Sequence, residues 1–401
     1  MDDMAQSLQP KERVCSTGYM ELSCRLCTKL SYRNATEMIN LFQHRDAGET
    51  IKLRTLSDSV ERVGEQISAR LEEMTQKVLK MYGFDSETGR PMEGVCLSAS
   101  ITSPAIPEKT EADIQAVDII IDSANASRDE KIPFTAEELD METSPLECVY
   151  VSIDDVGVKH QKDSRSQGTE KNAKYVENTV VHIQYGQDTY ALTACGMKNA
   201  MKAMLAFLVF NGLLKNRLVF FTDGARNIKS SIEEMFPFHP YTVILDWYHL
   251  KKKCQELLSM AVKGKDMRNK TLEKLLRILW VGDVKNAVRY LESLPSPVIK
   301  NQKWLDEQIN YLKRKEYSIT CYAVRAELGL RNSSNPVEKE NDMLVAQRQK
   351  HNGMSWSKNG SSALAAIEMV YQNKYEDIWF QHGQISFVMP KKETDSLDLC
   401  A

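Results

Sequence analysis

The sequence contains no apolar stretch that approaches the roughly 20 residues of a membrane-spanning helix. Its N-terminus, MDDMAQSLQPKERVCSTG, lacks the basic start and apolar centre of a signal peptide. Its nine cysteines are odd in number and scattered, which suits reduced thiols better than a disulfide framework. These absences predict a soluble, cytoplasmic protein with no membrane partner. Its 401 residues, 42% of them apolar, are enough for two or three domains with a real core.

The chain also lacks a net positive charge. Its formal charge is −3, so the composition alone does not indicate a nucleic-acid partner. The charges are nevertheless unevenly placed. Residues 101–147 contain twelve Asp and Glu against three basic residues, whereas residues 248–275 contain eight Lys and Arg against three acidic ones. We therefore expect one acidic, solvated region and one locally basic region.

Three cysteines near the N-terminus have a spacing that invites a metal-site interpretation. Cys15, Cys24 and Cys27 form C-x8-C-x2-C, but no fourth zinc ligand is obvious nearby. Two interpretations stay open, a zinc site and incidental free cysteines.

Residues 1–84 are predicted to be helical. RNATEMINLFQ places apolar residues on one helical face, and a second helical pattern starts near Thr55 or Ser57, either of which is a plausible N-cap. A helix, a break and a capped helix are compatible with a helix-turn-helix DNA-binding region. An ordinary helical hairpin fits the pattern equally well.

Residues 85–147 are rich in Ser, Pro, Asp and Glu, which predicts an acidic linker or loosely ordered connector. Within it, the apolar run AVDIII (116–121) could form one short strand.

Residues 148–249 show the order βββαβαβ. The expected strands are CVYVSID, NTVVHIQYG, DTYALTACG, LVFFT and YTVIL. Three of them end in an aspartate, namely Asp154, Asp223 and Asp246. Residues 250–330 show the pattern of three or four helices, and residues 331–380 contain a helix that begins at Pro336. The sequence of the tail, residues 381–401, predicts neither a structural element nor a functional residue.

Carboxylates from different elements can hold two divalent cations about 4 Å apart for phosphodiester chemistry. Asp154 and Asp223, at the ends of strands that could be adjacent, fit this need, with Glu338 or Glu340 as a third ligand. Each has a plainer interpretation. Asp154-Asp155 could start a polar loop and Asp223 could be a turn residue. Glu338 could complete a capping box with Asn335, while Asp246 and His249 could be a helix cap and a core histidine.

Four stretches together give a family resemblance: YVSIDDVGVKHQK, FFTDGARNI, ILDWYHLKKK and NPVEKENDMLVAQRQKHNGMSWSKNG. Over roughly residues 148–375 the chain resembles the DDE transposases of bacterial insertion sequences related to the mutator-like superfamily. The resemblance implies an α/β RNase H-like core, with a mixed five-stranded sheet and flanking helices, interrupted by an all-helical insertion. It also implies Asp154, Asp223 and Glu338 as catalytic metal ligands. The chain departs from the family at Asp155, where relatives often carry Gly, which leaves Asp154 or Asp155 as the first ligand.

The activity implied by the resemblance is metal-dependent cleavage at element ends and strand transfer into target DNA, with two Mg²⁺ (or Mn²⁺) ions. DNA would be the partner, bound by a dimer or larger assembly associated with the bacterial nucleoid. Asp246 and His249 would support the site. Phosphate contacts are expected from Lys251, Lys252, Lys253, Arg348, Lys350 and Lys358, and the alternative for these charges is a solvated helix face. Trp356 would either stack on an unpaired base or be a core residue. The alternatives are a non-catalytic DNA-binding protein, an inactive remnant, and an RNase H-like nuclease.

Overall fold

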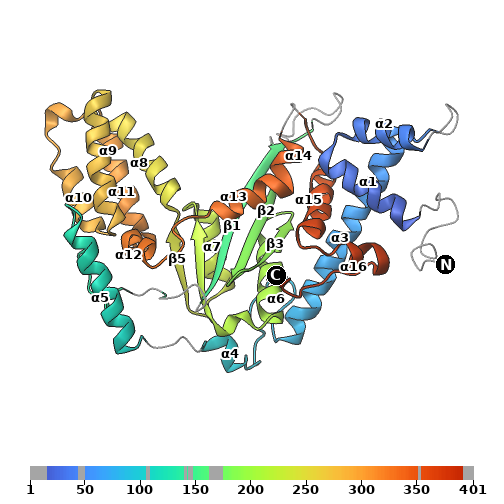
Figure 1. The fold of residues 1–401 in the computed structure, drawn as a ribbon, viewed down its shortest axis with the longest axis horizontal. Helices are drawn as coiled ribbons and strands as arrows, with labels where there is room; N and C mark the ends of the chain where they lie inside the picture. Colours follow the sequence, from blue (N-terminus) through green and yellow to red (C-terminus); the bar gives the residue numbers. More distant parts are fainter. Residues whose placement is uncertain are drawn as a thin grey trace, which may run out of the picture. The chain divides into compact units, whose positions relative to one another are not determined.

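The computed structural model describes residues 16–43, 50–104, 109–139, 142, 148–161, 175–350 and 354–391. Its centre is a five-stranded sheet in the order β3-β2-β1-β4-β5 (Figure 1). β1 is parallel to β4, and β4 to β5, whereas β2 is antiparallel to β3, so the sheet is mixed. The strands are β1 (Cys148–Lys159), β2 (Tyr175–Tyr185), β3 (Asp188–Ala194), β4 (Arg217–Thr222) and β5 (Tyr241–Leu245). This sheet and its flanking helices confirm the expected RNase H-like fold class.

The hairpin β2–β3 forms where the sequence predicts it. Val, Ile, Thr and Tyr are frequent in both strands, and these residues favour a pleated, half-buried surface. The register runs from Thr179 opposite Ala194 to Tyr185 opposite Asp188, which leaves a two-residue loop. Gly186 in this loop has φ +58°, a left-handed conformation that glycine adopts without steric cost.

β1 is longer than the sequence pattern suggests. It continues past Asp154 and Asp155 to Lys159, because Val156 and Val158 remain buried on alternate positions of the same strand. The two aspartates therefore lie within a strand. The expectation that β1 ends at Asp154, and the alternative that Asp154-Asp155 starts a loop, are both wrong.

The chain divides into two compact units that are discontinuous in sequence. The first unit comprises Met1–Ser98, Ile153–Leu213 and Pro336–Ala401, and the second comprises Ala99–Ser152 and Leu214–Asn335. β1 contributes to both, because Cys148–Ser152 pairs with β4 in the second unit and the strand's remainder belongs to the first. This division differs from the six consecutive segments that the sequence suggests.

The first unit contains β2, β3 and most of the N- and C-terminal helices. Its helices are α1 (Thr17–Lys29), α2 (Tyr32–Phe42), α3 (Leu53–Met81), α6 (Met197–Phe210), α13 (Asn335–Asn341, all but its first residue), α14 (Gln347–Gln349), α15 (Lys358–Gln372) and α16 (Glu376–His382). A five-residue π-helical segment, Asp342–Ala346, joins α13 to α14. Phe387, in the expected tail, is fully buried against Phe207 and Phe210.

α3 packs lengthwise against α15 in the first unit. A stripe that includes Val60, Ile67 and Leu71 is buried. At Gly64 the approach is so close that a Cβ atom would lie 2.3 Å from the carbonyl oxygen of Ala363. Residues 43–52 separate α2 from α3, a longer connection than the 3–4-residue turn of a helix-turn-helix. The connection is longer than that of a compact helix-turn-helix, and a DNA-binding role for this region stays a prediction.

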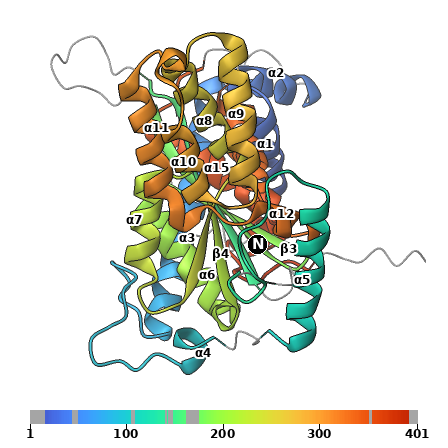
Figure 2. The same cartoon turned by 90° about the vertical axis from the view of Figure 1, so that its left-hand side faces the viewer.

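The second unit contains β4, β5 and a helical bundle. Its helices are α4 (Ala99–Thr102), α5 (Glu111–Ala126), α7 (Arg226–Met235), α8 (Trp247–Ala261), α9 (Lys265–Trp280), α10 (Val284–Glu292), α11 (Gln302–Lys315) and α12 (Tyr322–Glu327). Figures 1 and 2 show α8, α9, α10 and α11 side by side. Their buried faces share one hydrophobic cluster with β4 and β5. The helices after β5 agree with the expected all-helical insertion.

The acidic connector is more ordered than its composition suggests. Residues 116–121, expected as a strand, lie inside α5, which begins with a capping box between Thr110 and Asp113. Val117 and Ile121 are buried against residues of α12 such as Val324, because their spacing places them on one helical face. The apolar run resembles a strand because β-branched residues dominate it.

A single residue further along the connector is anchored by a buried ion pair. Glu142 accepts hydrogen bonds from the guanidinium of Arg325, at 2.9 Å and 2.6 Å, and from the hydroxyl of Tyr150, at 3.1 Å. Both charged side chains are 1% exposed. Both oxygens of this carboxylate are therefore satisfied inside the second unit, as a buried charge requires.

The structure bears on the expected zinc site and on the expected absence of a membrane span. Cys24 and Cys27 are fully buried in α1, and burial raises the pKa of the Cys27 thiol to about 12 and that of Cys24 further still. Cys15 lies outside the described residues. The described ranges contain no group of three or more His, Cys, Asp or Glu side chains placed to hold a metal ion. None of the described helices is long and apolar enough to cross a membrane.

Candidate active site

Asp154 is half-buried in the first unit and is held by the helix that follows the insertion. The side-chain amide of Asn341, at the end of α13, donates a hydrogen bond to Oδ2 of Asp154. Oδ1 accepts a hydrogen bond from the backbone N–H of Asp155 at 2.9 Å. Both oxygens of Asp154 are thus oriented, on the side of β1 that α13 covers.

Asp155 faces the other way, because successive side chains of a strand point to opposite faces. Its Oδ1 accepts a hydrogen bond from the hydroxyl of Thr179 on β2, at 2.6 Å. The contact with α13 therefore belongs to Asp154. This supports Asp154 over Asp155 as the first ligand of the expected site.

Glu338 and Glu340, the two candidates for a third carboxylate, have different surroundings on α13. Glu338 is exposed and lies one turn before Asn341, so the two side chains share a face of the helix. Glu340 is buried, and its Oε1 lies 3.4 Å from Nδ1 of the buried His182 on β2. Of the two, Glu338 has the i, i+3 spacing from Asn341, whose amide binds Asp154, whereas Glu340 is directed to His182. The π-helical segment directly after α13 is of a kind that often occurs at functional sites.

Asp223 directly follows β4 in the second unit and is half-buried. Its Oδ1 accepts a hydrogen bond from the backbone N–H of Ala225 at 2.7 Å. Gly224, with φ +86°, makes the turn possible, and its carbonyl oxygen accepts a hydrogen bond from the Lys315 ammonium at 2.7 Å. Burial lowers the pKa of Lys315, while the charge of Asp223 acts in the opposite direction. Asp223 therefore occupies a turn with a buried cation nearby.

Asp246 follows β5 and is the N-cap of α8, with no exposed surface. It accepts hydrogen bonds from the backbone N–H of His249 at 2.8 Å and from its Nδ1 at 3.0 Å. It also accepts bonds from the N–H and the hydroxyl of Ser334. Burial alone would raise the pKa of Asp246, but these hydrogen bonds hold it below its usual value. Asp246 thus fixes the chain at Ser334, just before α13 begins.

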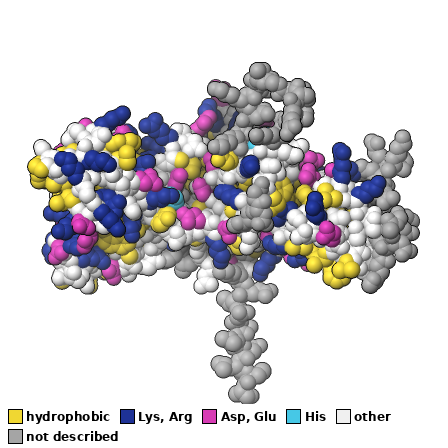
Figure 3. All heavy atoms as spheres, turned by 90° about the horizontal axis from the view of Figure 1, so that it is seen from above, with side chains coloured by type: hydrophobic (Ala, Val, Ile, Leu, Met, Phe, Trp, Pro, Cys, Tyr) yellow, Lys and Arg dark blue, Asp and Glu magenta, His cyan; other side chains and the backbone are white. Residues whose placement is uncertain are grey.

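The expected DNA contacts divide into exposed and buried residues. Lys251, Lys252, Lys253, Lys350 and Lys358 are exposed. On the face drawn in Figure 3, Lys and Arg side chains are interspersed with Asp, Glu and apolar ones. Arg348 and Trp356, in contrast, are only 7% and 6% exposed. Burial removes both from the surface that a DNA strand could contact, which corrects the phosphate contact expected of Arg348 and rules out the stacking interpretation of Trp356.

The buried pair has a packing role in the first unit. The guanidinium of Arg348 lies over the rings of Trp356 and Tyr32, 4.8 Å and 5.6 Å from their centroids. Its Nε donates to the carbonyl oxygen of Cys27, and the Trp356 indole N–H donates to that of Gln349. Of the two interpretations of Trp356, the core residue is the one that the structure shows.

A magnesium site would need hard oxygen ligands, and the carboxylates of Asp154, Asp223 and Glu338 are of that type. Asp154 and Glu338 belong to the first unit and Asp223 to the second. Since no three metal-binding side chains are gathered among the described residues, the two-metal centre stays a prediction.

Sequence reasoning missed Asn341 and Ser334, the two residues that hold the aspartates. Asn341 could have been found from its i, i+3 relation to Glu338, which places both side chains on one helical face. Ser334 carried no comparable signal, because its contact with Asp246 joins residues 88 positions apart.

Comparison with known proteins finds no similarity in sequence and a distant similarity among solved structures. No protein-family model matches the chain, and no curated protein matches it in sequence. Among solved structures, the chain is similar to the Drosophila P element transposase strand transfer complex, with a TM-score of 0.26 and 10% identity. The match covers 96% of this chain and 85% of the other. A similarity at this level assigns no function, so the fold class rests on the order and pairing of the strands.

Proposed function

We propose that the chain is a DNA transposase that cleaves element ends and transfers the freed strand to target DNA, with Asp154, Asp223 and Glu338 as its carboxylates. One observation carries this proposal. The parallel register of β1 and β4 ends with Ser152 opposite Phe221, and Asp154 and Asp223 each come two residues later along their own segments. Equal spacing from a parallel register favours side chains on the same face of neighbouring strands.

The surroundings of each residue support a division of roles. Asn341 orients the Asp154 carboxylate, and Glu338 lies on the same helical face as Asn341. Asp246 holds Ser334 at the start of this helix. Two Mg²⁺ or Mn²⁺ ions, held by the three carboxylates, would activate the attacking water or 3′-hydroxyl and stabilise the leaving oxygen. The exposed lysines after Asp246 would bind backbone phosphates and position the scissile strand.

The partners follow from the same proposal. DNA is the substrate, both as element end and as target. Because strand transfer joins two ends to one target, we expect a dimer or larger assembly on DNA, associated with the nucleoid of a bacterial cell. Assembly is a testable part of the proposal, since a monomer that cuts and joins both ends would contradict it.

The test is an excision and strand-transfer assay in Mg²⁺ or Mn²⁺, on DNA that flanks this gene in its source genome. Asp154→Asn and Asp223→Asn should abolish joined products. Asp155→Asn is the matched control, because it changes the adjacent carboxylate that contacts Thr179 and should retain activity. Asn341→Ala should reduce activity by about 10–100-fold, the usual effect of removing a group that orients a metal ligand.

Each outcome separates this proposal from the alternatives. Metal-dependent nicking without joined products would indicate an RNase H-like nuclease. Specific binding without cleavage, unaffected by Asp223→Asn, would indicate a DNA-binding protein or an inactive remnant. Equal loss in Asp155→Asn and Asp154→Asn would remove the assignment of Asp154.

A further inference from the structure

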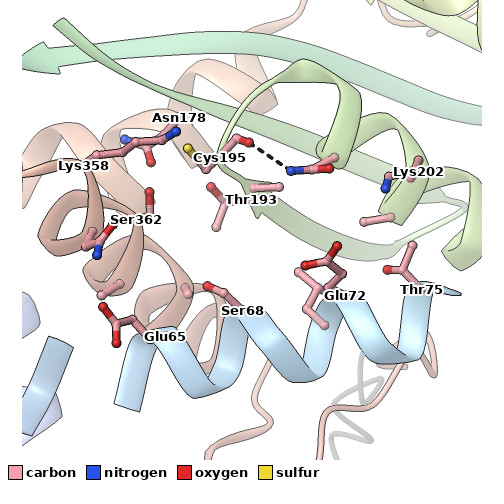
Figure 4. A pocket seen from close by; sticks show the side chains of 17 residues that line it. Glu65, Ser68, Glu72, Thr75, Asn178, Thr193, Cys195, Lys202, Lys358 and Ser362 are labelled. Carbon is pink, nitrogen blue, oxygen red and sulfur yellow. Dashed lines mark hydrogen bonds between the residues drawn. The ribbon is translucent and has the colours of Figure 1, made fainter. Parts of the chain in front are cut away.

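The first unit contains a pocket that the proposed function does not use. Its volume is about 440 Å³, within the usual range of small-molecule sites. Residues of α3, β2, β3, α6 and α15 line it (Figure 4). In Figure 4, Lys202 and Thr75 lie at one end of the pocket, and Asn178, Ser362 and Lys358 lie at the other. Polar groups therefore lie at both ends of the pocket.

Several residues that line this pocket have a buried polar atom without a partner. These atoms are Oγ1 of Thr75, Oδ1 of Asn178, Oγ1 of Thr193 and Oγ of Ser362, none of which has a hydrogen-bond partner among the described residues. Thr75, Asn178 and Thr193 are 4% exposed or less. A buried polar group left unsatisfied costs roughly 1–3 kcal/mol. Four such atoms around one cavity indicate that something polar fills it.

Lys202 adds a positive charge to this pocket. Its side chain is 4% exposed, although lysine is rarely buried without a charged partner. Among the described residues, the hydrogen-bond partner of its ammonium is the carbonyl oxygen of Ser86 at 3.5 Å, and not a carboxylate. A buried cation of this kind is stabilised when an anion approaches it.

The remaining residues around the pocket narrow the kind of ligand. No aromatic side chain of the described residues lines it, so it offers no ring for a planar aromatic ligand to stack on. Glu65 and Glu72 also line the pocket, and because both side chains are exposed, water screens their charges. Oδ1 of Asn178 accepts hydrogen bonds only, so the ligand must carry a donor at that end. The pocket thus combines a buried cation, three unpaired hydroxyl groups and one acceptor.

We propose that this pocket binds a small hydroxylated anion, with its phosphate or carboxylate at Lys202 and Thr75 and a hydroxyl group at Asn178. The hydroxyls of Thr193 and Ser362 hydrogen-bond the middle of the ligand. This site does not depend on the proposed DNA chemistry, and neither result affects the other.

The test is the thermal unfolding of the full chain with three six-carbon probes at matched ionic strength: sorbitol 6-phosphate, gluconate and sorbitol. An anion that binds should raise the midpoint by about 3 °C at a hundredfold excess over its dissociation constant. The phosphate and carboxylate probes distinguish the two anionic groups. No shift with either anion, or an equal shift with uncharged sorbitol, would overturn the proposal.

Variants test whether the anion binds in this pocket. Lys202→Met removes the charge at nearly constant volume and should weaken anion binding at least tenfold. Lys198→Met, on the exposed side of the same helix, is the matched control and should bind as the wild type does. Thr193→Val removes one hydroxyl without changing the shape and decides the question if Lys202→Met does not fold. Full binding by either pocket variant would show that the anion sits elsewhere.

Discussion

Two strands of the second unit are followed directly by an aspartate, and the two aspartates differ in burial and in hydrogen bonding. Asp246, after β5, is fully buried and accepts hydrogen bonds from His249 and Ser334 at both oxygens. Asp223, after β4, is half-buried and accepts one backbone hydrogen bond at Oδ1. The same position after a strand therefore gives one carboxylate whose two oxygens both hold the fold together, and one whose Oδ2 can still bind a ligand. A carboxylate that serves chemistry must keep such capacity.

The largest expected difference is in stability. Asp246→Asn should lower the free energy of unfolding by about 3 kcal/mol, because it removes a buried charge and turns an amide N–H toward donors. Asp223→Asn should lower it by less than about 1 kcal/mol, because Asn keeps an oxygen for the N–H of Ala225 and only the attraction to the Lys315 ammonium is lost. Urea unfolding of the two variants measures both values. Similar losses in the two would abolish the distinction between these aspartates.

A second prediction concerns the pH dependence of the stability that Asp246 contributes. The pKa of Asp246 is lowered in the folded state, so its ionised form stabilises the fold. This contribution is complete above the unfolded-state pKa of about 3.9 and is lost as the pH falls through the lower, folded-state value. The stability advantage of the wild type over Asp246→Asn should therefore shrink below about pH 4. Urea unfolding of both proteins across this range measures it, and a constant difference would contradict the assignment.

The smallest effect on stability is expected for substitutions of the lysines in the first turns of α8, which follow Asp246. Lys251, Lys252 and Lys253 are exposed on α8, so replacing all three with Ala should change the free energy of unfolding little. If they bind phosphates, the slope of log affinity against log salt should fall by about 0.9 for each phosphate that is no longer neutralised. Ala at the exposed Lys285, Lys300 and Lys303 provides the matched control. An unchanged slope in the first triple variant would show that these lysines do not bind DNA.

Much of the fold could be predicted from local sequence. Strands rich in β-branched residues and the glycine at the β2–β3 turn are local signals, and the structure has these elements where they are expected. The expected strand at 116–121 is wrong, because the burial of Val117 and Ile121 depends on α12, some 200 residues away. Local patterns do not contain that partner.

The candidate site shows the same limit. Asp154, Asp223 and Asp246 could be selected from their places after apolar runs, but not ranked, because the distinction lies in Asn341 and Ser334. Arg348 and Trp356 have the sequence surroundings of surface residues, in a basic, Gly-rich stretch. Their burial comes from Tyr32 and Cys27, which lie more than 300 residues earlier in the chain.

The packing of α3 against α15 has a consequence for synthesis. α3 ends at Met81 and α15 begins at Lys358, so a ribosome adds about 280 residues between them. At 5–20 residues per second this takes roughly 15–60 s. During that time the stripe containing Val60, Ile67 and Leu71 has left the ribosome without the helix that covers it. The nascent chain therefore presents an apolar helix face long before α15 covers it, and stable folding of this unit waits until α15 has been translated.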